Sequence, residues 1–272
     1  MLSPTPDVTT NGIHIAGVSV QFDGQDGSVV TAVDSVEQHV APGSFVSIVG
    51  PSGCGKSTLL NVVAGLQRPS SGSVQIGDRS VSGPDRSLGM VFQEDSTLPW
   101  KTVQENVAFG LKIARVPKAE QQETTRRMID LVALAGFENS YPSQLSGGMR
   151  QRVAIARTLA LNPEVLLMDE PFGALDQQTR IILGSELLRI WEANRKTVLF
   201  VTHDIQEAVL LSQQVWVMSF RPGRIIDVVD IDLPEHRDTT IVSSHRFNEL
   251  SNHIWDSVRQ EAMIGFAQQE HG

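Results

Sequence analysis

Short, strongly apolar runs recur along the chain and predict β-strands. The clearest runs are Ile13 to Phe22, Phe45 to Val49, Val165 to Met168, Val198 to Val201 and Val215 to Met218. The last four are nearly continuous in valine, leucine and isoleucine, which is typical of parallel strands that are covered on both faces. Helical patterns separate several of these runs, so the predicted fold class is α/β with a mostly parallel sheet.

The first run differs because it leads into a short polar turn. Gly24, Gln25, Asp26 and Gly27 resemble the turn of a β-hairpin. We therefore expect a small antiparallel sheet at the N-terminal edge. Residues 1–11, which precede this strand, are expected to form a disordered lead-in.

After residue 101 the pattern changes from strand to helix. Thr102 and Glu105 predict a capping box at a helix start, and Pro117 precedes a second helix that is expected to end at Gly136. The apolar positions expected at helical spacing are Val103, Val107 and Ala114 on the first helix and Met128, Leu131, Val132 and Ala135 on the second. These segments predict a helical subdomain.

We expect one α/β domain over residues 12–233, with the helical subdomain inserted at about residues 94–150. The tail, residues 234–272, is expected to contain a further helix. Its apolar residues share one helical face: Phe247, Leu250, Ile254 and Val258. The simplest interpretation is a helix that docks on its own core, and a regulatory or dimerising role remains an open alternative.

The composition excludes several classes of function. The formal net charge is −9, whereas nucleic acids are bound by clustered lysine and arginine, so we expect no nucleic-acid partner. The single cysteine, Cys54, excludes an intrachain disulfide and a cysteine-rich metal site. No apolar run approaches the roughly 18 residues of a membrane span, and the N-terminus lacks the pattern of a signal peptide. If the protein works at a membrane, another chain must supply the span.

The segment GPSGCGKS, Gly50 to Ser57, follows an apolar strand and precedes a helix. Its spacing fits the phosphate-binding pattern G-x-x-x-x-G-K-[ST], in which glycines let backbone N–H groups close around phosphate oxygens. Lys56 is expected to reach the β- and γ-phosphates of ATP, and the Ser57 hydroxyl is expected to ligate Mg²⁺. The residues expected to contact ATP here are Gly50, Pro51, Ser52, Gly53, Cys54, Gly55, Lys56, Ser57 and Thr58.

Cys54 lies inside this loop, and its side chain has two interpretations. A nearby helix N-terminus favours the thiolate, which would make the cysteine reactive. We prefer the alternative of a small filler, because nothing near it in the sequence looks like a catalytic base.

Two carboxylates follow the apolar run of VLLMDEP, Val165 to Pro171. Alone, they would be interpreted as charges that cap a strand. In a chain that also has a phosphate loop, Asp169 is placed to hold Mg²⁺, usually through water, and Glu170 to polarise the attacking water.

Two polar residues complete the candidate site. Gln93 follows a short apolar run and is expected to contact Mg²⁺ or the attacking water, whereas His203 follows the run LFV near the expected γ-phosphate. In folds of this kind, ligands bind at the carboxyl ends of the strands, where all these residues are expected to lie. The catalytic candidates are Glu170, His203 and Gln93, and the metal-binding candidates are Ser57, Gln93 and Asp169.

A second pair of glycines occurs in LSGGMRQR, Leu145 to Arg152. This helix start is suited to an anion, but it brings no lysine or Mg²⁺ ligand of its own. The phosphate loop, Gln93, LSGGM, VLLMDEP, ALD at Ala174 to Asp176 and His203 occur in the order found in ATP-binding cassette (ABC) ATPases. The chain resembles this family over roughly residues 13–230.

The resemblance implies that two cassettes face each other head to tail, with the signature loop of each closing over the ATP of the other. The signature loop here comprises Ser146, Gly147 and Gly148. It also implies that Asp176 lies at the seam between the cassettes. Phe22 becomes the candidate for stacking on adenine, and a strand residue that packs inward is the alternative. The family usually has glutamine where this chain has Met149, so a side-chain contact from that position is in doubt.

The stretches GPDRSLGMVFQEDSTLPWKTVQENVAFGL and SFRPGRI resemble ATPases of nitrate, sulfonate and taurine importers. The resemblance implies a second ATPase subunit, most simply an identical one. It also implies transmembrane permease subunits and, indirectly, a periplasmic or lipoprotein solute-binding protein. The chain would lie at the cytoplasmic face of the inner membrane. Leu98, Pro99 and Trp100 would contact the permease, although Trp100 also fits internal packing.

Three alternatives remain. The chain would serve an importer of another small solute, or it would be a non-transport ABC ATPase acting in DNA repair or translation. Members of the latter class commonly have long coiled-coil inserts, basic surfaces or two cassettes in one chain, and none is visible in this sequence. A small-molecule P-loop kinase would leave the signature loop and the ALD segment without a role.

Overall fold

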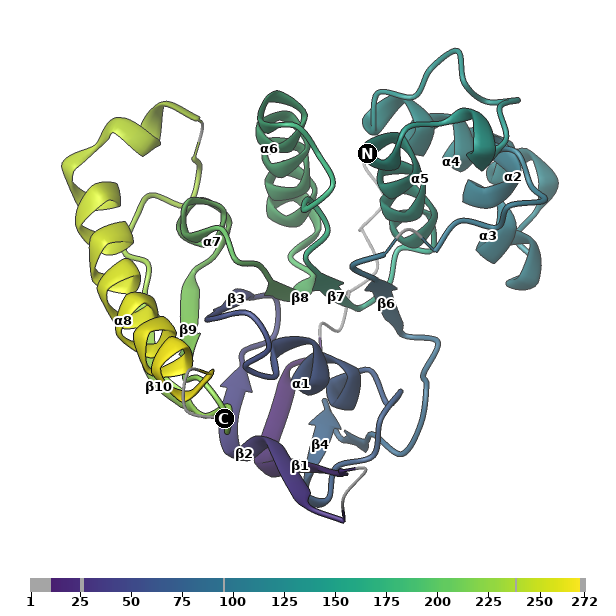
Figure 1. The fold of residues 1–272 in the computed structure, drawn as a ribbon. Coiled ribbons are helices and arrows are strands. Elements are labelled where there is room, and N and C mark those ends of the chain that lie inside the picture. Colours follow the sequence, from purple (N-terminus) through teal and green to yellow (C-terminus); the bar gives the residue numbers. More distant parts are fainter. Residues whose placement is uncertain (1–10, 25–26, 95, 238, 270–272) are drawn as a thin grey trace.

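The computed structural model describes residues 11–24, 27–94, 96–237 and 239–269, and its strands form two sheets (Figure 1). The larger sheet has the strand order β10-β9-β3-β8-β7-β6. Its strands are β3 (Phe45–Val49), β6 (Leu88–Val91), β7 (Val165–Asp169), β8 (Thr197–Val201), β9 (Gln214–Met218) and β10 (Ile225–Asp230). Only β10 runs antiparallel to its neighbour, so the mostly parallel α/β sheet is confirmed.

The smaller sheet is antiparallel, as the first strand and its turn predict. Its order is β2-β1-β4-β5, formed by β1 (Ile13–Asp23), β2 (Val29–Val40), β4 (Ser71–Ile76) and β5 (Arg79–Ser80). In the predicted hairpin turn, Gln25 and Asp26 lie outside the described residues, as do residues 1–10 of the expected lead-in.

Alternate residues of the parallel strands face two different layers. Leu167 of β7 packs with α1 (Lys56–Val63) and the antiparallel sheet, whereas Leu166 and Met168 pack with α6 (Gln177–Asn194) and the helical segment. Figure 1 shows α1 on one side of the large sheet and α6 and α7 (Ile205–Leu211) on the other. Both faces are therefore buried, which explains the continuous apolar runs.

The predicted helical subdomain is formed by short helices that pack around α5. These elements are α2 (Val103–Val107), α3 (Phe109–Ile113), α4 (Lys118–Leu131), η1 (Pro142–Gln144) and α5 (Gly147–Ala160). The capping box of Thr102 and Glu105 is present in both directions. Helix α5 begins near residue 150, where the subdomain is expected to end, and continues to Ala160, with most of its residues from Val153 onward buried.

Two details of the helical prediction are wrong. Ala114 and Ala135 are exposed, whereas Leu111 and Leu134 fill the expected core positions. Helix α4 ends at Leu131 rather than at Gly136, and Ala133 adopts a left-handed φ of 52°. Arg152 of α5 explains the early end, because its guanidinium donates at 3.0 Å to the carbonyls of Val132 and Ala133, which the helix end leaves without helical partners.

The tail contains η2 (Thr239–Ser243) and α8 (His245–Gln269). Phe247, Leu250 and Ile254 are buried against α7, β9 and β10, and Val258 packs against the same cluster, so the predicted apolar face is confirmed. Figure 1 shows α8 running along β9 and β10. None of the helices in the described ranges is long and apolar enough to cross a membrane.

Candidate active site

The loop between β3 and α1 is packed so closely that two of its glycines have no space for a side chain. A Cβ at Gly50 would lie 2.6 Å from the carbonyl oxygen of Met218, and one at Gly55 would lie 2.7 Å from that of Ala32. Gly55 also has a φ of +108°, which disfavours any other residue. The glycines therefore let the chain pass directly from β3 into α1, which begins at Lys56.

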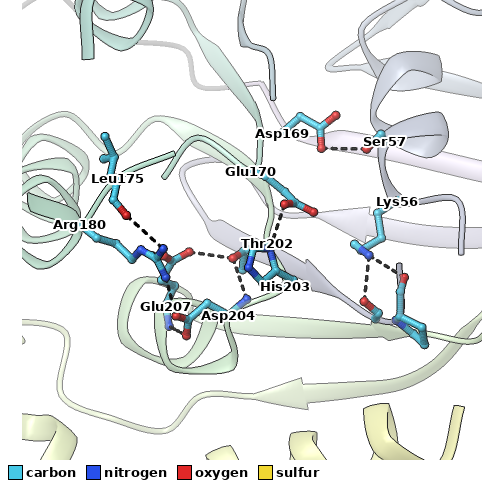
Figure 2. A network of polar contacts seen from close by, with 12 residues as sticks. Lys56, Ser57, Asp169, Glu170, Leu175, Arg180, Thr202, His203, Asp204 and Glu207 are labelled. Carbon is cyan, nitrogen blue, oxygen red and sulfur yellow. Dashed lines mark hydrogen bonds and ion pairs between the residues drawn. The ribbon is translucent and has the colours of Figure 1, made fainter. Parts of the chain in front are cut away.

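Lys56 is buried at the centre of this loop. Its Nζ donates to the carbonyl oxygens of Gly50 and Pro51, both at 2.8 Å (Figure 2). An ammonium group that is only 6% exposed needs such partners. Because charged acceptors form stronger hydrogen bonds than neutral carbonyls, a phosphate entering the loop offers this amine a better partner.

Cys54 is fully buried beneath the loop, and its sulfur faces the backbone of Gly50. Burial raises the pKa of the thiol, although the positive charge of Lys56 acts in the opposite direction. This agrees with the filler interpretation and not with a reactive thiolate. Any contact of Cys54 with a nucleotide is therefore limited to its backbone.

Ser57 and Asp169 join the start of α1 to the end of β7. The Ser57 hydroxyl donates to Asp169 Oδ1 at 2.9 Å (Figure 2). Burial raises the pKa of Asp169, because an apolar surrounding disfavours the carboxylate, while the bond from Ser57 opposes this effect. A hydroxyl and a carboxylate so close together offer the oxygen ligands that Mg²⁺ prefers.

Glu170 points away from Asp169 and towards His203. Its Oε2 lies 2.9 Å from His203 Nδ1 (Figure 2). Glu170 has a left-handed φ of 43°, and its backbone N–H donates to the carbonyl of Val201 at 2.9 Å. Such backbone conformations cost about 1–3 kcal/mol and gather at functional sites. The turn of the chain at Glu170 separates the two carboxylates.

A polar network behind His203 was not predicted from the sequence. Thr202 donates to Glu207 Oε2 at 2.7 Å, while Arg180 lies 3.2 Å from the other oxygen of Glu207 and 3.0 Å from Asp204 (Figure 2). Burial raises the pKa of Glu207 to about 7, and the attraction of Arg180 does not compensate for this effect. The network fixes the residues on both sides of His203.

One part of this network follows a sequence pattern, namely the spacing of Asp204 and Glu207 at a helix start. Asp204 is the N-cap of α7, and its carboxylate accepts from the backbone N–H groups of Gln206 and Glu207. An aspartate followed three residues later by a glutamate is typical of helix starts. The pairing with Arg180 of α6 depends on tertiary structure, so the sequence alone does not predict it.

Many of the predicted nucleotide residues line one cavity of about 350 Å³, whereas Gly50, Pro51 and Cys54 of the loop, and Asp169 and His203, do not line it. It is lined by Phe22, Val30, Ala32, Ser52, Gly53, Gly55, Lys56, Ser57, Thr58, Gln93, Glu170 and Arg221. Phe22 is 45% exposed, so the alternative that it packs inward is wrong. The sequence analysis did not identify Val30, Ala32 or Arg221 as site residues; SFRPGRI only marked a resemblance.

The signature loop is not among the residues that line this cavity. Ser146 is the N-cap of α5, and its Oγ accepts from the backbone N–H of Met149 at 3.3 Å; Gly147 and Gly148 form the first turn. Asp176 caps α6 and accepts from the N–H of Thr179, which lowers the pKa of Asp176. These two helix starts therefore form a separate part of the surface.

Comparison with known proteins agrees with this geometry. A family model described as ABC transporter matches residues 33–173, just over half of the chain. The chain belongs to the ABC transporter ATPase family. The match covers both the glycine loop before Lys56 and the paired carboxylates Asp169 and Glu170.

Several relatives cover nearly the whole cassette. An uncharacterized ABC transporter ATP-binding protein of Methanocaldococcus jannaschii is 49% identical over 88% of each chain. The nitrate import ATP-binding protein NrtD of Synechocystis is 47% identical over 84% of this chain and 85% of its own. The taurine import ATP-binding protein TauB of Rhizobium johnstonii is 47% identical over 89% of this chain and 94% of its own.

A solved structure is similar as well. The ATP-binding cassette MJ0796, described as a dimeric post-hydrolysis state bound to ADP and Pi, matches with a TM-score of 0.75 and 32% identity. The match covers 82% of this chain and 100% of that one. The α/β P-loop fold predicted from the sequence is therefore confirmed.

Proposed function

We propose that this cassette is the ATP-hydrolysing motor subunit of an importer for a small anion such as nitrate, a sulfonate or taurine. The observation that supports it most is the 47% identity to relatives named for nitrate and taurine import, over more than four fifths of both chains. In this proposal the cassette is a peripheral subunit at the cytoplasmic face of the inner membrane.

Within the cavity, Lys56 neutralises the phosphate charge, and Glu170 acts as the base that polarises the attacking water. His203, which forms a hydrogen bond with Glu170, fixes the position of that carboxylate and faces the γ-phosphate. Gln93, which also lines the cavity, contacts the water or the metal. A positioned base of this kind contributes about 10²–10⁴ in rate.

The oxygen donors of the site fit Mg²⁺. Ser57 and Asp169 would hold the ion, which supplies charge neutralisation for the phosphates. Among the described residues, no group of three or more histidine, cysteine, aspartate or glutamate side chains is arranged as a metal site. The nucleotide and water must therefore supply the remaining ligands, as is usual for Mg²⁺ bound together with ATP.

A second cassette completes each site in this proposal. Ser146, Gly147 and Gly148 do not line the cavity of their own chain, and a helix start with free N–H groups is suited to a phosphate. We infer that they cover the ATP of a second, identical subunit. Asp176 would then lie at the seam between the two subunits.

The segment after Gln93 is the proposed contact with the permease. Trp100 is 70% exposed, and Pro99 is also exposed, so the alternative of internal packing for Trp100 is wrong. An exposed indole is suited to a protein partner. ATP binding would close the cassettes, and the movement would reach the membrane subunits through this patch.

The test is transport by the complete assembly. The cassette is reconstituted in liposomes with its permease subunits and solute-binding protein, and ATP hydrolysis and uptake are measured with nitrate, taurine, an alkanesulfonate or a neutral sugar as control. One of the anions should stimulate hydrolysis and be taken up, and Glu170→Gln should abolish both. Stimulation by the sugar alone would contradict the substrate class, and co-purification with nucleic acid instead of a permease would contradict transport.

A further inference from the structure

The loop between β9 and β10, residues 219–224, brings a cation to the nucleotide cavity that the proposed hydrolysis does not use. Arg221 lines the same cavity as Lys56 and Ser57. Its Nε donates to the carbonyl oxygen of Gly53 at 2.7 Å, and its Nη2 lies 3.2 Å from the position that a Cβ of Gly53 would occupy. The guanidinium therefore rests directly on the phosphate-binding loop.

Arg221 keeps most of its donors available. A guanidinium has five N–H donors, and the bond to Gly53 uses one of them. Arg224 of the same loop forms an ion pair with Asp34, whereas no carboxylate in the described ranges pairs with Arg221. Arginine is suited to phosphate because its planar fork matches two phosphate oxygens.

The loop itself is held firmly between β2 and the phosphate-binding loop. Gly223 donates to the carbonyl of Ala32 and accepts from the N–H of Asp34, both at 3.0 Å. A Cβ at Gly223 would lie 2.1 Å from the carbonyl oxygen of Cys54, so no larger residue fits. Arg221 is therefore placed before any nucleotide arrives, which lowers the entropic cost of a contact.

The tail helix holds the other side of this loop. The N–H of Phe220 donates to Glu261 of α8 at 2.9 Å. Gly265 of the same helix lies against the ring of Phe220, because a Cβ there would approach the ring to 2.8 Å. The residue next to Arg221 is thus fixed by α8, and the docked tail is linked to the nucleotide cavity.

We propose that Arg221 is a nucleotide-binding residue that contacts the β- and γ-phosphates of ATP, and that α8 positions its loop for this contact. The inference rests on ATP binding in the cavity around Lys56. It assigns a positioning role to Glu261, which acts through Phe220 and does not touch the nucleotide.

The test measures the dissociation constants of ATP, ADP and AMP for the intact chain by calorimetry. The constant for AMP is obtained from its competition with ATP. Arg221→Ala should weaken ATP binding about tenfold, and AMP binding much less. The affinity of Arg221→Lys for ATP should lie between those of the wild type and Arg221→Ala. The ammonium keeps the positive charge but lacks the planar fork of the guanidinium. Arg259→Ala is the matched control, since Arg259 is an exposed arginine of α8 and should leave all three constants unchanged.

A second pair of variants tests the role of α8. Glu261→Ala should weaken ATP binding about threefold, and Glu261→Gln should restore it, because the amide oxygen still accepts from Phe220. Unchanged ATP binding in Arg221→Ala, with binding lost in Lys56→Ala, overturns the inference but leaves the ATP site intact. Equal losses for ATP and AMP in Arg221→Ala also overturn it, because AMP lacks the β- and γ-phosphates and the contact would then lie on the nucleoside or the α-phosphate. Failure of the wild-type chain to bind ATP would instead contradict the proposed function.

Discussion

Replacing Glu207 by glutamine should remove a measurable part of the pH dependence of stability. The Glu207 side chain is 12% exposed, it accepts from Thr202 at 2.7 Å, and burial raises its pKa from 4.5 to about 7. The folded chain therefore binds this proton more tightly than the unfolded chain does. The resulting stability is fully present below pH 4.5 and is lost as the pH rises through 7.

The size of the effect follows from the two pKa values. Between pH 5 and pH 8, the free energy of unfolding of the wild type should fall by about 2–3 kcal/mol more than that of Glu207→Gln. The glutamine is neutral at every pH and still accepts a hydrogen bond from Thr202. The stability of this variant therefore lacks the pH dependence that comes from protonation of Glu207. Glu123→Gln on α4 is a matched control, because Glu123 has the same charge but is exposed and forms no ion pair with the other described residues.

The assay is urea unfolding at pH 5, 6, 7 and 8, with the free energy extrapolated to water for each variant. The Glu123→Gln profile should run parallel to that of the wild type. Parallel profiles for the wild type and Glu207→Gln over the whole range would refute the reasoning, because Glu207 would then titrate alike in both states. If the free energy of unfolding fell more steeply with pH in Glu207→Gln than in the wild type, folding would lower the pKa of Glu207 instead of raising it.

The remaining predictions concern the hydrolysis site. Glu170→Gln should bind ATP normally, hydrolyse it about 10²–10⁴ times more slowly, and accumulate as a closed dimer in gel filtration with ATP; wild-type phosphate release would show that another group is the base. Cys54→Ala should keep close to the wild-type rate of ATP hydrolysis, because the thiol is buried and protonated. An inactive Cys54→Ala variant with an unchanged circular dichroism spectrum would return the thiol to the list of functional groups.

The sequence predicts the interior strands and the phosphate loop because both depend on local patterns. The runs at β3 and β7 are buried at every position, so their apolar character is unbroken. The capping box at Thr102 likewise depends on residues three positions apart. Strand β10 has an alternating burial pattern and two aspartates, and it was missed because it forms the edge of the sheet.

Other parts of the site depend on contacts between distant segments. The early end of α4 follows from Arg152, which lies on another helix. Arg180 and Glu207 meet because α6 and α7 pack on the same face of the sheet, and Arg221 reaches Gly53 only because β9 lies beside β3. Motifs identify the residues that follow strand ends, whereas the groups that hold them are known only from the tertiary structure.

The most direct test of the proposed head-to-tail site is to mix two inactive variants. Lys56→Ala removes the amine of the phosphate loop but leaves the signature loop intact. Gly147→Asp places a carboxylate in the signature loop, where a Cβ would meet only the Arg150 side chain, at 3.7 Å, and where the added charge repels phosphate.

Each variant alone should be inactive, and ATP hydrolysis is measured before and after the two are mixed in equal amounts. If each site takes its phosphate loop from one chain and its signature loop from the other, mixed dimers contain one intact site. Hydrolysis should then recover to about one quarter of the wild-type rate for random pairing. A mixture as inactive as its components would contradict the account, because each site would then need both loops from one chain.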